Sequence, residues 1–90
     1  MPFALVRDRI ESWKADRGEF EQLVHRTHRQ AYGLAYRLTG SSVEAEDLVQ
    51  EAYLRAFRFF EKYDPALPFT SWLYRIMANA HVDMVRRRGR

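Results

Sequence analysis

The stretch at residues 41–68 reads SSVEAEDLVQEAYLRAFRFFEKYDPALP, and it decides the fold class. Ser41 is followed three residues later by Glu44, which is the pattern of a capping box at the start of a helix. The two prolines of the closing YDPALP end the helix, because proline lacks an amide hydrogen and disfavours helix in the residue before it. We therefore expect a helix from this cap to about Lys62. Its apolar residues recur every three or four positions, as on a helix with one buried face: Ala45, Leu48, Val49, Ala52, Tyr53, Ala56, Phe59, Phe60 and Tyr63.

The same periodicity continues after the prolines. A helix is expected to begin between Pro68 and Thr70 and to run to about Arg87. Its predicted buried stripe is Phe69, Trp72, Leu73, Ile76, Met77, Ala80 and Met84.

Two further helical segments precede the opening stretch. Residues 3–14 (FALVRDRIESWK) predict a short helix with Phe3, Val6, Ile10 and Trp13 on one side. Asp16 and Glu19 form a second capping-box pattern, so a separate helix is expected from about Arg17 to Leu38, with Gly40 just past its end. Its predicted stripe is Phe20, Leu23, Val24, Thr27, Ala31, Leu34, Ala35 and Leu38. With no competing strand pattern, the fold class is all-α: a compact bundle of three long helices plus a short N-terminal helix.

The composition limits the function classes. Ninety residues correspond to one domain. The absence of cysteine excludes disulfides and thiolate metal sites. His25 and His28 have the spacing of metal ligands, but no third ligand is evident and a metal site is not expected. The four glycines are scattered, so no glycine-rich phosphate loop is present. No apolar run is long enough to span a membrane. We expect a cytoplasmic, non-enzymatic protein without metal, cofactor or small-molecule substrate.

The charges of the chain are separated along its length, although the formal net charge is only +3. The segment at 44–51 carries Glu44, Glu46, Asp47 and Glu51 and no basic residue. The segment at 75–90 carries five arginines and one aspartate. Two segments of opposite charge indicate two partners of opposite character, whereas the simpler interpretation is a pair of solvated helix faces.

The outward face of the helix at 42–62 carries a leucine within a polar ring. At 100° per residue, Leu54 lies on the side opposite the apolar stripe, where it is surrounded by Asp47, Gln50, Glu51 and Arg58. A single exposed leucine is ordinary. An apolar anchor with a polar rim is also the pattern of a small protein-docking patch. The residues alone leave both interpretations open.

The outward face of the last helix carries Arg75, Asn79, Val82 and Arg86 at positions i, i+4, i+7 and i+11. Arginine pairs with phosphate and an asparagine amide can read a base edge. Tyr63 and Tyr74 are the nearby aromatic residues expected to be exposed, and such rings stack on unpaired bases. Phe69 and Trp72 are expected to pack in the core instead. Asp83 lies at the edge of the buried stripe, where we expect it to pair with an arginine of another helix.

Three segments together resemble a known family. AEDLVQEAYLRAF, PFTSWLYRIMANAHVD and the closing arginines occur in the order and spacing of the second conserved region of bacterial extracytoplasmic-function (ECF) sigma factors. The resemblance runs from about residue 16 to residue 88. It implies a domain of RNA polymerase sigma factors that recognises and melts the promoter −10 element.

The resemblance also implies partners for both faces. Asp47, Gln50, Glu51 and Leu54 match positions that dock on the clamp helices of the polymerase β′ subunit. The loop and helix at 63–86 match positions that hold the non-template strand as single-stranded DNA, with a flipped base near the loop. The residues implied in DNA binding are Tyr63, Asp64, Ala66, Leu67, Pro68, Tyr74, Arg75, Asn79, Val82 and Arg86. An anti-sigma factor is a further partner typical of the family.

Members of this family normally continue into a second helical domain that reads the −35 element, and that domain is absent from these 90 residues. Residues 1–90 are therefore expected to be a region 2 domain excised from a longer protein. One alternative is a sigma mimic that binds an anti-sigma factor without engaging DNA, but a mimic has no need of Arg75 and Asn79. Another is a generic helical DNA-binding module, which would bind duplex at least as well as single strands.

Overall fold

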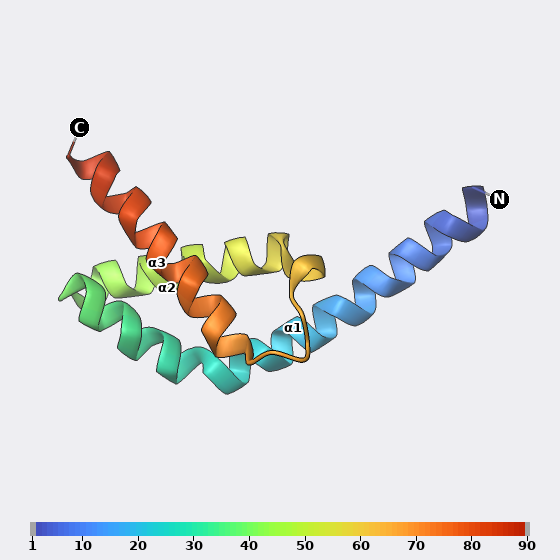
Figure 1. The fold of residues 1–90 in the computed structure, drawn as a ribbon, viewed down its shortest axis with the longest axis horizontal. Helices are drawn as coiled ribbons and strands as arrows, with labels where there is room; N and C mark the ends of the chain where they lie inside the picture. Colours follow the sequence, from blue (N-terminus) through green and yellow to red (C-terminus); the bar gives the residue numbers. More distant parts are fainter. Residues whose placement is uncertain (1, 90) are drawn as a thin grey trace.

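A computed structural model describes the backbone of residues 2–89 and the side chains of residues 17–89. The helices are α1 (Pro2–Thr39), α2 (Ser42–Arg58) and α3 (Phe69–Arg88), with a short 3-10 helix, η1 (Phe60–Lys62), after α2. No strand occurs within residues 2–89, and the all-α prediction is confirmed. The three α-helices contact one another pairwise, and the N-terminal half of α1 extends away from the bundle (Figure 1).

The predicted boundary between the first two helical segments is wrong. Residues 2–39 form one continuous helix of 38 residues, so the short N-terminal helix is not a separate element. No proline occurs between residues 3 and 64 to interrupt it. Gly18 inside the helix costs only about 1 kcal/mol, too little to end it. The predicted apolar stripe of residues 3–14 lies outside the described side chains.

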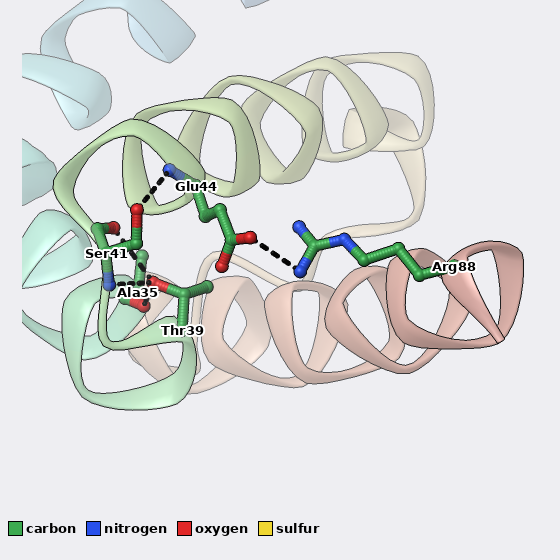
Figure 2. Close-up of polar contacts among 5 residues, drawn as sticks. All are labelled: Ala35, Thr39, Ser41, Glu44 and Arg88. Carbon is green, nitrogen blue, oxygen red and sulfur yellow. Dashed lines mark hydrogen bonds and ion pairs between the residues drawn. The ribbon is translucent and has the colours of Figure 1, made fainter.

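The turn from α1 to α2 follows the predicted signals (Figure 2). Gly40 adopts φ 71°, a left-handed conformation that favours glycine, and its N–H donates to the Tyr36 carbonyl at 2.8 Å. Ser41 is the N-cap of α2, and its Oγ accepts from the Glu44 N–H at 3.3 Å. Only this half of the capping box forms, because the Ser41 N–H donates to Thr39 Oγ1 at 3.4 Å and the Glu44 carboxylate pairs with Arg88 at 2.6 Å.

The α-helical part of the opening stretch ends at Arg58, earlier than predicted. The chain then tightens into η1, with Lys62 N donating to the Phe59 carbonyl at 2.9 Å and Tyr63 N to the Phe60 carbonyl at 3.0 Å. Residues three apart eclipse in a 3-10 helix. Phe60 and Tyr63 accordingly stack, with ring centroids 5.8 Å apart, just before the loop that leads to α3.

The core lies between the C-terminal half of α1 and the facing sides of α2 and α3. Leu48, Leu73 and Met77 are its largest fully buried side chains. Leu38 and Phe59, both predicted for the core, are 37% and 43% exposed, because each lies where its helix ends and its partners run out. The buried residues are Phe20, Thr27, Ala31, Ala35, Ala45, Leu48, Val49, Ala52, Ala56, Phe69, Leu73, Met77 and Ala80.

Candidate functional site

The first candidate surface is on α2 and consists of Asp47, Gln50, Glu51 and Leu54, which we call the α2 surface. Asp47 and Gln50 are exposed, and Leu54 is 61% exposed although it is a large apolar residue. Glu51 is only partly exposed. An exposed leucine with polar neighbours is thus present on this side of α2, as the sequence pattern predicted.

An apolar groove of about 500 Å³ between α1 and α2 borders this surface. Leu54 and Gln50 belong to both the surface and the groove. The sequence pattern missed the α1 side, because residues 30 positions away in the chain come together only through packing. The groove is lined by Arg17, Phe20, Glu21, Val24, His28, Val49, Gln50, Tyr53, Leu54 and Phe57.

A hydrogen-bonded pair fixes the wall of this groove. Thr27 Oγ1 donates to the Leu23 carbonyl at 2.7 Å, so its single proton is used there. The Tyr53 hydroxyl, 2.7 Å away, is therefore the donor to Thr27 Oγ1. Burial raises the pKa of Tyr53. The Tyr53 ring also stacks on His28, with centroids 6.5 Å apart and planes at 9°.

One arginine connects the α2 surface to α3. Arg55 Nε donates to Glu51 Oε2 at 2.8 Å, and Arg55 Nη1 lies 2.9 Å from Asp83 Oδ2. The pairing expected for Asp83 with an arginine of another helix is confirmed. The hydrogen bond to Glu51 raises the pKa of Arg55 and outweighs the opposing effect of burial, with Asp83 adding to the rise.

The second candidate surface begins at the loop of residues 63–68. Three hydrogen bonds brace it: Tyr63 Oη to the Leu67 carbonyl at 2.6 Å, Ala66 N to Asp64 Oδ1 at 2.9 Å, and Leu67 N to the Asp64 carbonyl at 3.0 Å. Asp64, Ala66 and Pro68 are exposed, and Leu67 is 60% exposed. The loop thus presents an apolar side chain on a preorganised turn.

Tyr63 is less exposed than predicted. It is partly buried, and its ring lies 5.2 Å from that of Trp72, 5.4 Å from that of Phe69 and 5.8 Å from that of Phe60, centroid to centroid. Tyr74 is also partly buried. These contacts fix the Tyr63 ring at the base of the loop.

A recess of about 530 Å³ lies between this loop and α1, and we call it the loop recess. Its volume is within the range of ligand pockets in proteins. The α1 side was not predicted, because nothing in the sequence links α1 to the loop. The recess is lined by Glu19, Gln22, Leu23, Arg26, Phe60, Glu61, Tyr63 and Pro65.

The outward side of α3 carries Arg75, Asn79, Val82 and Arg86, which we call the α3 face. All four are exposed, Val82 at 45%. Helical rise puts Asn79 about 15 Å along α3 from Phe69, at the end of the loop. Of the closing arginines, Arg88 is engaged by Glu44 (Figure 2).

Residues 23–90 match the family described as Sigma-70 region 2. The chain belongs to this family. The resemblance to region 2 of ECF sigma factors, predicted from the sequence, is confirmed. The match covers α2, the loop and α3 completely, and with them every residue of the two candidate surfaces.

Curated relatives of this region 2 domain are named as RNA polymerase sigma factors. The chain is 48% identical over 71 residues to the ECF RNA polymerase sigma factor SigE of Mycolicibacterium smegmatis, covering 79% of this chain and 27% of that protein. It is 35% identical over 85 residues to SigW of Bacillus subtilis, covering 93% and 46%. It is 32% identical over 77 residues to the RNA polymerase sigma-H factor of Pseudomonas aeruginosa, covering 86% and 40%. The chain thus spans less than half the length of these relatives.

Neither a metal site nor a membrane-spanning helix is indicated in the described part of the domain. Within it, no group of three His, Cys, Asp or Glu side chains could hold a metal ion. His25 and His28 are exposed on α1. Among the described residues, no helix combines the length and apolarity that crossing a bilayer would require.

Proposed function

We propose that this domain acts in transcription initiation, binding RNA polymerase core through the α2 surface and holding the melted promoter −10 element along the loop and the α3 face. The observation that carries the proposal is the pairing of two unlike exposed surfaces in one region 2 domain. The α2 surface has an exposed leucine among acidic and polar residues. The α3 face has arginines and an asparagine amide, beside a loop that is held by hydrogen bonds.

The α2 surface suits the clamp helices of the β′ subunit. Leu54 offers apolar area at the edge of an apolar groove. Asp47 offers an exposed carboxylate that makes no ion pair among the described side chains. Apolar anchors with charged rims are typical of specific protein interfaces. An anti-sigma factor bound at the same place would compete with the polymerase.

The loop and the α3 face suit single-stranded DNA. Arg75 and Arg86 would pair with phosphates, which gives affinity independent of sequence and dependent on salt. A flipped base of the non-template strand would enter the loop recess, where Tyr63 offers a ring and the polar side chains offer partners for base edges. Asn79 would read a further base.

The DNA half of the proposal is tested with labelled single-stranded oligonucleotides in which each −10 position is varied at a fixed salt concentration. Asn79→Ala should weaken binding and relax the preference at one position by about 1–3 kcal/mol. Val43→Ala, a truncation at an exposed residue outside both surfaces, is the control and should bind as the unaltered chain does. Equal affinities for all oligonucleotides would contradict base recognition, and tighter binding to intact duplex would favour a generic DNA-binding module.

The polymerase half is tested with a fragment containing the β′ clamp helices. Asp47→Lys should abolish or strongly weaken binding while the unfolding curve stays unchanged. Glu46→Lys makes the same charge change at an exposed neighbour on α2 that is outside the surface, and it should retain binding. Retained binding by Asp47→Lys would remove this docking proposal. Absence of DNA binding by the unaltered chain in the oligonucleotide assay would instead favour a sigma mimic.

A further inference from the structure

Asp83 is an acidic residue beside the proposed DNA-binding surface. It is on α3, four residues from Asn79 and three from Arg86, so helical geometry puts it about 70° from the centre of the α3 face. Its side chain is 42% exposed. An unpaired carboxylate at this place would repel the phosphates that Arg75 and Arg86 are proposed to bind.

Arg55 holds this carboxylate from the neighbouring helix. Arg55 Nη1 lies 2.9 Å from Asp83 Oδ2, and Arg55 Nε is bonded to Glu51 Oε2 at 2.8 Å. The Arg55 side chain is only 20% exposed. The two contacts use separate nitrogens of a rigid planar group, so the bond to Glu51 fixes the guanidinium in the orientation in which Nη1 meets Asp83.

We propose that Arg55 is a positioning residue for DNA binding: it neutralises Asp83 and holds that carboxylate against α2, away from the path of the strand. This inference rests on the proposed DNA-binding function. Arg55 itself need not touch DNA. Its contact with Glu51 means that the same guanidinium also fixes one carboxylate of the α2 surface.

The test uses the 90-residue chain and a labelled single-stranded oligodeoxynucleotide of randomised sequence, because the effect on phosphates does not depend on base identity. Arg55→Met should weaken binding about two- to fivefold at about 0.05 M salt, and the deficit should shrink at about 0.2 M salt. Arg55→Lys, which keeps a cation near Asp83, should bind within about twofold of the unaltered chain.

A pair of double variants separates charge placement from net charge and from packing. R55M/D83N removes the exposed carboxylate and should restore the affinity of the unaltered chain. R55M/E46Q has the same net charge as R55M/D83N but leaves Asp83 unpaired, so it should remain weak. Both lack the bridge between α2 and α3, and urea unfolding should report similar stabilities.

Each remaining outcome counts against the inference. Equal binding by Arg55→Met and the unaltered chain would overturn it, and so would a deficit that does not change with salt. A deficit that D83N fails to restore would show a role in packing, and rescue by E46Q would show an effect of net charge alone. In these cases the unaltered chain still binds DNA and the proposed function stands. Absence of binding by the unaltered chain would overturn both.

Discussion

Two leucines of α2 offer a direct comparison between a residue that holds the fold and one that is proposed to bind a partner. Leu48 is fully buried, and Leu54 is 61% exposed. Both are in the same helix, so truncation to alanine makes the same chemical change with the same small effect on helix propensity. Leu48→Ala should destabilise the domain, whereas Leu54→Ala should weaken binding to the β′ clamp helices.

The sizes of the two effects follow from exposure. Truncating a fully buried leucine removes its transfer free energy and leaves a cavity, at a cost of about 2–5 kcal/mol. That is a large part of the roughly 5–13 kcal/mol expected for the unfolding of a chain of this length. Burying a whole leucine side chain contributes about 1.5–3 kcal/mol, so covering the exposed 61% of Leu54 contributes about 1–2 kcal/mol. This corresponds to a loss of about 5- to 30-fold in affinity for Leu54→Ala.

Unfolding in urea followed by circular dichroism would give the free energies, and titration calorimetry with a fragment containing the β′ clamp helices would give the affinities. Leu54→Ala should unfold within about 1 kcal/mol of the unaltered chain. The reasoning fails if Leu54→Ala binds the fragment within twofold of the unaltered chain. It also fails if Leu54→Ala costs as much stability as Leu48→Ala.

Other substitutions test the structure at single points. Gly40→Ala should cost about 1–2 kcal/mol in urea unfolding, because φ is 71° and an added Cβ would be strained there although no neighbouring atom crowds it. Gly18→Ala is inside α1 and equally uncrowded, so it should stabilise the domain by about 0.5–1 kcal/mol. Equal effects of the two substitutions would contradict the left-handed conformation of Gly40. Ser41→Ala should cost about 1 kcal/mol through the lost N-cap, and an unchanged unfolding midpoint would argue against that cap. Tyr53→Phe should cost about 1 kcal/mol at neutral pH through the lost hydrogen bond to Thr27. The pKa of Tyr53 in the folded state is raised above 10.0, so the contribution of its hydroxyl to stability is complete below pH 10.0 and is lost as the pH rises through the folded-state pKa. In a series of urea unfolding curves at alkaline pH, the unaltered chain should therefore lose more stability than Tyr53→Phe. An equal loss of stability in both proteins would count against the raised pKa.

The sequence predicted what depends on neighbours along the chain. The cap at Ser41, the glycine turn at Gly40 and the start and end of α3 all appear as expected, because capping and turn geometry involve only a few consecutive residues. One prediction from local signals was wrong: the capping pattern at Asp16 does not start a helix, because it lies inside the continuous helix α1. Such a pattern permits a helix start but does not break a helix that has no proline.

The sequence by itself determined the presence of helices α2 and α3, most of their buried stripes, and the two outward faces, because 100° per residue assigns each side chain a side of its helix. Only the tertiary structure decided which helices meet at each surface. The groove beside Leu54 and the loop recess each need α1, and the ion pair between Arg55 and Asp83 joins residues 28 positions apart on two helices. Periodicity carries no information on which helix lies opposite a given side chain, since that depends on how all three helices bury their apolar stripes together.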